Sequence, residues 1–284
     1  MTRYLIAGAG GMLGTDLQRV LQGRDVSALA RADLDITDRA AVDAAVAGHD
    51  IVFNAAGYTN VDGAEEDEAD ATRINAQGAG NLAKAAAAAG AFLVQYSTDY
   101  VFDGTATNPY PEDAILGPVS AYGRSKAEGE RLAQRLNPGR TAIIRTAWLY
   151  GEHGGNFAKT MLRLASERDE LAVVTDQVGQ PTWTMDLARQ SVALVHSDGP
   201  AGVYHGTNAG QASWWEFARA IFEIAGLDPD RVKPTDSTQF RRPAPRPAYS
   251  VLATTAWNRA GLQPMRHWRE ALREAFTTEA LGAP

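Results

Sequence analysis

The chain has no cysteine, which excludes disulfide bonds, thiol nucleophiles and cysteine-ligated metal sites. Its five histidines are scattered, and no two of them have the spacing that puts two metal ligands on one helix face. We therefore expect no bound metal. No apolar run approaches the roughly 20 residues that are needed to cross a bilayer.

Positive charge is also scarce, since 27 lysines and arginines face 34 acidic residues and the formal net charge is -7. Proteins that bind nucleic acid normally carry a basic excess, so we expect no nucleic-acid partner. The first residues run directly into glycines, without the basic segment and cleavage site of a signal peptide. These features predict a cytoplasmic protein that does not contact a membrane.

What is present is an ordinary globular composition, with 45% hydrophobic and 21% charged residues in a chain of 284. Apolar runs of strand length alternate with helix-like stretches such as Asn75–Ala89. Such alternation predicts an α/β fold with a doubly wound parallel sheet of Rossmann type. The expected strands are Tyr4–Ala7, Val26–Leu29, Ile51–Asn54, Phe92–Ser97 and Ala142–Arg145.

The alternation loosens after Trp148, where glycines and shorter helices take over. We expect residues 1–147 to form a dinucleotide-binding domain. Residues 148–284 are expected to form mainly a smaller C-terminal substrate-binding lobe, with some segments returning to the sheet. A helix over Arg266–Ala280 is expected to close the chain.

A glycine-rich turn follows the first expected strand and opens a helix over Met12–Leu21, which is the context of a dinucleotide-binding motif. Such glycines allow a tight turn, let the backbone approach a pyrophosphate and let the helix pack on the sheet, while the helix N-terminus offers free N–H donors. A turn without a ligand is the alternative. The candidate cofactor residues here are Gly8, Gly10, Gly11, Met12, Leu13 and Gly14.

No acidic residue follows the second expected strand, where one would bind a ribose 2′-hydroxyl. Arg31 stands there instead, and its guanidinium can pair with a 2′-phosphate, which favours NADPH over NADH. A solvated surface arginine is the alternative. Asp35 and Ile36 can flank an adenine, although helix capping by Asp35 or Asp38 is an equal alternative.

Tyr122 and Lys126 are four residues apart in a segment, Ala121–Leu136, that is rich in helix-forming residues. The spacing puts both side chains on one helix face. A nearby ammonium favours phenolate and lowers a tyrosine pKa, which acid–base catalysis requires. Thr98, at the carboxyl end of an expected strand, would hold a substrate carbonyl oxygen while Tyr122 protonates it and Lys126 holds the ribose.

Together these motifs resemble those of the extended short-chain dehydrogenase/reductases, and more narrowly the dTDP-4-dehydrorhamnose reductase family. The resemblance runs nearly end to end. Besides the glycine turn, it is carried by residues 54–62 (NAAGYTNVD), 97–102 (STDYVF), 122–126 (YGRSK), 145–151 (RTAWLYG), 155–161 (GNFAKTM), 176–182 (DQVGQPT) and 246–252 (RPAYSVL).

The resemblance implies a catalytic relay of Thr98, Tyr122 and Lys126, with Tyr122 and Lys126 also contacting the cofactor. Other residues that it implies in the cofactor site are Asn54, Ala55, Ala56 and Tyr58. Residues that it implies or allows in the substrate site are Thr98, Asp99, Tyr122, Trp148, Asn156 and Gln177.

Several of these positions have structural alternatives. Trp148 matches a tryptophan that packs against the sugar, but it would also suit a hydrophobic core. Asn156 and Gln177 can donate to the sugar or thymine, or cap a loop. Asn75 matches an asparagine that supports the active site, or it lies on a helix surface.

One basic stretch, Arg241–Pro247, stands out in this acidic chain. Prolines stiffen it, and Arg246 can bind the diphosphate of a nucleotide sugar. A solvated linker is the alternative.

The resemblance implies NADPH-dependent reduction of the C4 ketone of a dTDP-4-keto-6-deoxy sugar, with dTDP-4-dehydrorhamnose reduced to dTDP-L-rhamnose; NADH is the alternative cofactor. Two other functions remain open: a nucleotide-sugar epimerase or dehydratase, and a non-catalytic NADP-binding regulatory subunit.

Some members of the family form dimers through magnesium bound by glutamates. Here Asp16 and Met185 stand at such positions, so a monomer is expected.

Overall fold

The computed structural model describes residues 1–197, 201–278 and 281. Its central feature is a parallel sheet that contains six strands among these residues, in the order β10-β5-β4-β3-β1-β2. All five predicted strands are present, so the predicted α/β class is confirmed. The strands are β1 (Arg3–Ala7), β2 (Asp25–Leu29), β3 (Ile51–Asn54), β4 (Phe92–Thr98), β5 (Thr141–Thr146) and β10 (Gly202–His205).

The strand order places β1 between β2 and β3. The chain therefore moves outward from β1 to β2 and then crosses back to β3 on the other side. In a doubly wound sheet, this reversal opens a crevice at the carboxyl ends of the strands. The glycine turn after β1 and the loop after β3 lie at that point.

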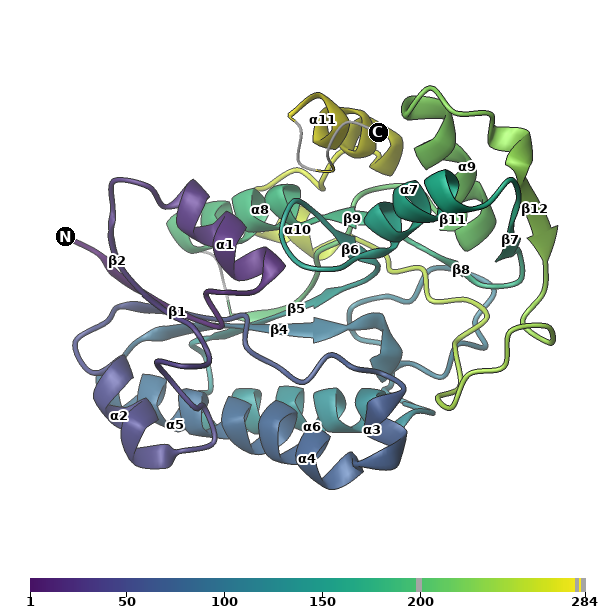
Figure 1. Ribbon diagram of the computed structural model, residues 1–284. Helices are drawn as coiled ribbons and strands as arrows, with labels where there is room; N and C mark the ends of the chain where they lie inside the picture. The colour runs from purple at the N-terminus through teal and green to yellow at the C-terminus, as the bar shows by residue number, and fades with distance from the viewer. Residues whose placement is uncertain (198–200, 279–280, 282–284) are drawn as a thin grey trace.

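Helices cover both faces of the sheet (Figure 1). One face carries α1 (Met12–Val20) and α8 (Thr184–His196), and the other carries α2 (Arg39–Val46), α5 (Ala79–Ala89) and α6 (Ala121–Leu136). Side chains of one strand alternate between the two layers: Ile6 packs with the α1/α8 side, whereas Leu5 packs with the α2/α5 side. This burial on both faces explains the continuously apolar strands.

Two predicted helices differ in detail from the structure. The stretch Asn75–Ala89 begins as a π-helix, η1 (Arg73–Gly78), before it continues as α5. The closing helix α11 spans Trp268–Thr277, because His267 caps it by accepting from the Arg269 N–H. The last two residues of the predicted helix, Glu279 and Ala280, lie outside the described residues.

Several elements from the second half of the chain pack together beside the carboxyl edge of the sheet (Figure 1), and are called the smaller lobe here. Its core gathers aromatic side chains, among them Tyr150, Phe217 and Trp268. The strand β10 returns to the main sheet by pairing with β5. The lobe contains α7 (Phe157–Glu167), α9 (Trp214–Ile224) and α11, with the strand pairs β6 (Leu149–Tyr150)/β9 (Thr182–Trp183), β7 (Leu171–Val174)/β12 (Val232–Thr235) and β8 (Val178–Gly179)/β11 (Ala212–Ser213).

Short helices complete the fold. Among them, α3 (Gly63–Glu66) and α4 (Glu68–Thr72) lead from β3 toward η1, η2 (Asp99–Val101) follows β4, and α10 (Ala256–Arg259) packs near β10. Within the described residues, every helix is too short or too polar to traverse a bilayer.

Candidate active site

The glycine turn and the loops after β2 and β3 enclose a cleft of about 630 Å³, a size that suits a cofactor. Gly8 has a φ of +81°, and a Cβ there would lie 2.5 Å from the Ala56 nitrogen. The turn therefore requires glycine at this position. A Cβ added at Gly10 or Gly11 would have its nearest neighbouring atom at 3.4 Å or more. The backbone of these two residues is therefore open toward the cleft.

Most of the predicted cofactor residues line this cleft. They are Gly8, Gly10, Gly11, Arg31, Asp35, Ile36, Ala55, Ala56 and Tyr58. The helix α1 begins directly after this turn, so its free N–H groups and positive end suit a pyrophosphate. The residues present therefore fit a dinucleotide.

Four other predicted cofactor residues, Met12, Leu13, Gly14 and Asn54, do not line this cleft, and neither do Tyr122 and Lys126, which are described below. Leu13 is part of the buried core, and Gly14 lets α1 pack on the turn, because a Cβ there would be 2.2 Å from the Gly8 carbonyl oxygen. Asn54 is buried and donates to Gln95 Oε1 at 2.6 Å, while its own oxygen accepts from the Ala56 N–H. The sulfur of Met12 faces Asn156. A direct cofactor contact for these four residues stays a prediction.

Arg31 is exposed at the cleft. Hydrogen bonds from Thr37 lower the pKa of the Asp35 carboxyl, and the positive charge of Arg31 contributes to this lowering. The Asp35 carboxylate accepts from the backbone and hydroxyl of Thr37, whereas Asp38 caps α2. Capping is thus confirmed for Asp38. Arg73 also lines the cleft and donates to the Thr37 hydroxyl at 2.7 Å. Sequence reasoning missed Arg73, because nothing distinguishes it from an ordinary helix arginine.

The three predicted catalytic side chains come from two adjacent elements. Thr98 ends β4, while Tyr122 and Lys126 lie one turn apart on α6. The hydroxyl of Thr98 lies close enough to that of Tyr122 to lower the pKa of the phenol. Thr98 also donates to Asp99 Oδ1 at 3.0 Å. The structure therefore joins phenol, hydroxyl and carboxyl in one line of contacts.

Burial raises the pKa of Tyr122 to about 12, and the contact with the Thr98 hydroxyl only partly offsets this. Lys126 does not lower that pKa as we expected. Its ammonium instead donates to the Tyr96 carbonyl oxygen at 2.7 Å, and burial lowers its own pKa to about 8. Tyr122 is therefore protonated at neutral pH, which is the form that a proton donor needs.

The start of α6 is held against its neighbours by close contacts. A Cβ on Gly123 would lie 2.2 Å from the Tyr100 carbonyl oxygen. Ser120 caps the helix at the Gly123 N–H, and Glu65 accepts from the Ala121 N–H at 2.8 Å. These contacts leave Tyr122 little freedom to move relative to Thr98.

Asn75 supports the site from η1. It is 3% exposed, its oxygen accepts from the Tyr58 N–H, and its amide donates to the Tyr58 carbonyl and to the Ser125 hydroxyl. The helix-surface alternative is therefore wrong. A π-helical turn often marks a functional site, and here it points Asn75 between the cleft loop and α6.

Trp148 has a left-handed backbone, with a φ of 48°, which is strained for a bulky residue. Its ring stacks on Trp214 with centroids 3.5 Å apart. A Cβ on Gly179 would lie 2.6 Å from its ring. The surrounding structure thus maintains a costly conformation, as is common at functional sites.

Two predicted substrate residues make other contacts. Asn156 caps α7 at the Lys159 N–H and donates to the Gly151 carbonyl oxygen. Gln177 donates to the Ser237 hydroxyl at 2.8 Å. Capping by Asn156 is therefore confirmed, while substrate contact by either residue stays a prediction.

Arg246 lies beside Tyr100, which contacts Tyr122. Its guanidinium carbon is 5.8 Å from the centre of the Tyr100 ring, and Tyr100 meets Tyr122 edge-on with ring centroids 5.8 Å apart. It also pairs with Asp62 at 3.0 Å. The basic stretch is therefore attached to the dinucleotide-binding half, unlike a free linker.

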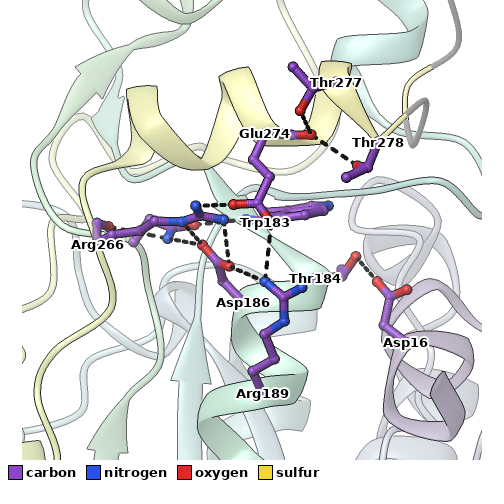
Figure 2. Close-up of polar contacts among 10 residues, drawn as sticks. Asp16, Trp183, Thr184, Asp186, Arg189, Arg266, Glu274, Thr277 and Thr278 are labelled. Atoms are coloured by element: carbon purple, nitrogen blue, oxygen red, sulfur yellow. Dashed lines mark hydrogen bonds and ion pairs between the residues drawn. The ribbon is translucent and has the colours of Figure 1, made fainter. Parts of the chain in front are cut away.

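Asp16, at the position considered for metal bridging, is buried and accepts from the Thr184 hydroxyl at 2.6 Å (Figure 2). Burial raises its pKa. Met185 packs against the core of the smaller lobe. No group of three or more potential metal ligands occurs within the described residues.

Comparison with known proteins gives consistent matches over nearly the full chain. The profile of the family described as RmlD substrate binding domain matches residues 2–280. A dTDP-4-keto-6-deoxy-D-glucose reductase from Streptomyces niveus is 49% identical over 278 residues, covering 96% of each chain. A dTDP-4-dehydrorhamnose reductase from Streptomyces griseus is 49% identical, covering 96% of this chain and 93% of the relative. The structure of a dTDP-4-dehydrorhamnose reductase from Bacillus anthracis in complex with NADP has a TM-score of 0.93 and 39% identity, and covers 98% of this chain and 100% of its own.

Proposed function

Because the chain belongs to the RmlD substrate-binding-domain family, we propose that it is an NADPH-dependent reductase of the C4 ketone of a dTDP-4-keto-6-deoxy sugar. The substrate that its relatives favour is dTDP-4-dehydrorhamnose, and the product is dTDP-L-rhamnose. The observation that carries this function is the Thr98–Tyr122 contact at the carboxyl edge of the sheet, beside the glycine cleft.

NADPH supplies the hydride that reduces the ketone carbon. Tyr122 donates its phenolic proton to the ketone oxygen, so the carbonyl gains one hydride and one proton and becomes an alcohol. Thr98 donates a hydrogen bond to the same oxygen and stabilises the charge that develops on it. Lys126, whose ammonium is held near α6 by the Tyr96 carbonyl oxygen, orients the ribose near Tyr122.

The remaining predicted residues have roles in binding. Arg31 pairs with the 2′-phosphate of NADPH. Trp148 offers an aromatic surface to the apolar side of the deoxysugar. Asp99, Asn156 and Gln177 provide polar contacts to the substrate, and Arg246 binds its diphosphate.

We also propose that the protein is a monomer located in the cytoplasm. Asp16 is engaged by Thr184, and Met185 offers no charged ligand for a bridging metal. Sedimentation with and without a chelator tests this, and a dimer that dissociates on chelation would contradict it.

The function is tested by incubating the protein with dTDP-4-keto-6-deoxy sugars and NADPH and identifying the product by NMR. We expect stoichiometric oxidation of NADPH and reduction at C4. An epimerase or dehydratase would instead recycle its cofactor without net consumption. A regulatory subunit would convert neither substrate.

A further inference from the structure

Asp62 precedes α3 at its N-cap position, yet its side chain makes no capping hydrogen bond. The carboxylate instead accepts from Arg246 Nη2 at 3.0 Å and from the Ala244 N–H at 3.2 Å. A third contact, to Arg242 Nη1, measures 3.8 Å. An aspartate at an N-cap normally accepts hydrogen bonds from the first N–H groups of its own helix. This side chain instead binds the basic stretch Arg241–Pro247.

Arg246 is oriented by two further contacts besides Asp62. Its guanidinium lies over the Tyr100 ring. The stretch itself is pressed onto the loop after β4, where a Cβ on Gly104 would lie 2.5 Å from Pro247. Asp62, Tyr100 and Gly104 all belong to the dinucleotide-binding half, so that half determines where Arg246 points.

One nitrogen of this guanidinium, Nη1, makes no hydrogen bond to the part of the chain that the structure describes. Arg246 Nη1 is buried and unpaired among the described residues, and the side chain is 20% exposed. A buried cationic donor without an acceptor is costly. The group therefore has one nitrogen that donates to Asp62 and another that lacks an acceptor among the described residues, a need that an anionic oxygen would meet.

The place of Arg246 matches the chemistry of a nucleotide sugar. The diphosphate is attached at C1 of the sugar, and the ketone at C4 lies across the ring. Tyr100 separates Arg246 from Tyr122 in the same way, with Arg246 over its ring and Tyr122 at its edge. An arginine at this place can bind the diphosphate while Tyr122 reaches the ketone oxygen.

We infer that Asp62 is a positioning residue that holds Arg246 with Nη1 directed at the diphosphate of the nucleotide sugar. This inference rests on the proposed function. It assigns Asp62 a role in substrate affinity that is exerted through Arg246, without contact to the reacting atoms. Loss of the carboxylate releases the guanidinium, so the rotational freedom that the ion pair removes must then be lost on binding.

The experiment compares binding of dTDP and thymidine by calorimetry in the wild type and in Asp62→Asn. We expect the variant to bind dTDP about tenfold more weakly, as for one lost charged hydrogen bond, and thymidine unchanged. With the keto-sugar, KM rises by about the same factor while kcat stays within about twofold. The affinity for NADPH is unchanged and reports that the fold is intact.

Three variants complete the design. Arg246→Ala loses affinity for dTDP to a similar degree, and adding Asp62→Asn to it causes no further loss. Arg246→Lys keeps the positive charge but loses the planar guanidinium. In this variant too, adding Asp62→Asn should change the affinity for dTDP little. Arg241→Ala is the matched control, since this exposed arginine of the same stretch should leave dTDP binding unchanged.

Wild-type affinity for dTDP in Asp62→Asn, or tighter binding, contradicts the inference alone. Additive losses in the double variant do the same. A wild-type protein that binds neither dTDP nor the keto-sugar contradicts the proposed function as well.

Discussion

Arg266 binds Asp186 through two parallel hydrogen bonds, Nε to Oδ2 at 2.8 Å and Nη2 to Oδ1 at 2.9 Å (Figure 2). The Asp186 carboxylate also accepts from Asn208, and the Arg266 guanidinium lies over the Trp183 ring and contacts Glu274 of α11. The pair therefore joins α8 to the closing helix of the smaller lobe.

Replacing Asp186 by Asn should strongly destabilise the protein. The side chain of Asp186 is 8% exposed. An amide in its place cannot accept both hydrogen bonds from Arg266, at a cost of about 2 kcal/mol, although Arg266 keeps its ion pair with Glu274. The free energy of unfolding in urea measures this. Asp230→Asn is the control, because Asp230 pairs with Arg219 at the surface with a side chain 79% exposed. Equal stability of the two variants would contradict the structural role of the pair.

Gly123→Ala should impair both stability and turnover. The added methyl would meet the Tyr100 carbonyl oxygen, so α6 must shift, at about 1–3 kcal/mol, and carry Tyr122 with it. Thermal unfolding and kcat are the measurements. Gly117→Ala is the matched control, because its Cβ would lie 3.5 Å from the nearest atom and should be tolerated. A Gly123→Ala enzyme with normal turnover would argue against close docking of α6.

Tyr122→Phe should reduce kcat by about 100-fold or more, since it removes the proton donor, and leave the affinity for NADPH unchanged. Steady-state kinetics and fluorescence titration with NADPH give the two quantities. Tyr4→Phe removes a phenol that bonds to His196 far from the glycine cleft, and should retain turnover. Near-normal kcat in Tyr122→Phe would refute the mechanism.

Lys126 should make stability depend on pH in the cofactor-free protein. Burial lowers its pKa to about 8 from 10.5, so between these values the unfolded chain binds more protons than the folded one. The contribution of Lys126 to the free energy of unfolding therefore becomes more favourable as pH rises from 8 to 10.5, by about 3 kcal/mol in total. Urea unfolding across this range, compared with Lys126→Met, isolates the effect. Parallel curves for the two proteins would show that Lys126 titrates normally.

Arg31→Ala should lower kcat/KM with NADPH by about tenfold and leave NADH kinetics nearly unchanged, because only NADPH carries the 2′-phosphate. The ratio of the two specificities is the measured quantity. Arg39→Ala is the control, since Arg39 pairs with Asp43 on α2. An equal loss of kcat/KM with both cofactors would show that Arg31 does not bind the 2′-phosphate.

Local patterns in the chain were enough to predict the strands, the glycine turn, and the helix that carries Tyr122 and Lys126. Each of these depends on residues that are close in sequence: an apolar run, glycines beside a helix start, and two side chains one turn apart. The proximity of Thr98 and Tyr122 followed as well, because Thr98 ends β4 and Tyr122 lies in the first turn of the long helix that follows, at the carboxyl edge of the sheet.

The protonation state of Tyr122 could not be predicted in the same way. The four-residue spacing suggested that Lys126 lowers the pKa, but burial dominates and Lys126 donates to Tyr96 instead. Desolvation depends on everything packed around a group, which spacing along one helix does not reveal. The π-helical turn at Asn75 likewise depends on contacts with Tyr58 and Ser125.

The amino-acid sequence by itself therefore determined the strands β1–β5, the glycine turn and the helix that carries Tyr122 and Lys126, because short-range periodicity and residue chemistry encode them. Only the tertiary structure decided how tightly Gly123 docks on Tyr100 and that Arg246 is held by Asp62, 184 positions away. Such contacts form where packed layers meet. Their energy depends on burial and on close approach between residues distant in sequence, which local sequence patterns do not reveal.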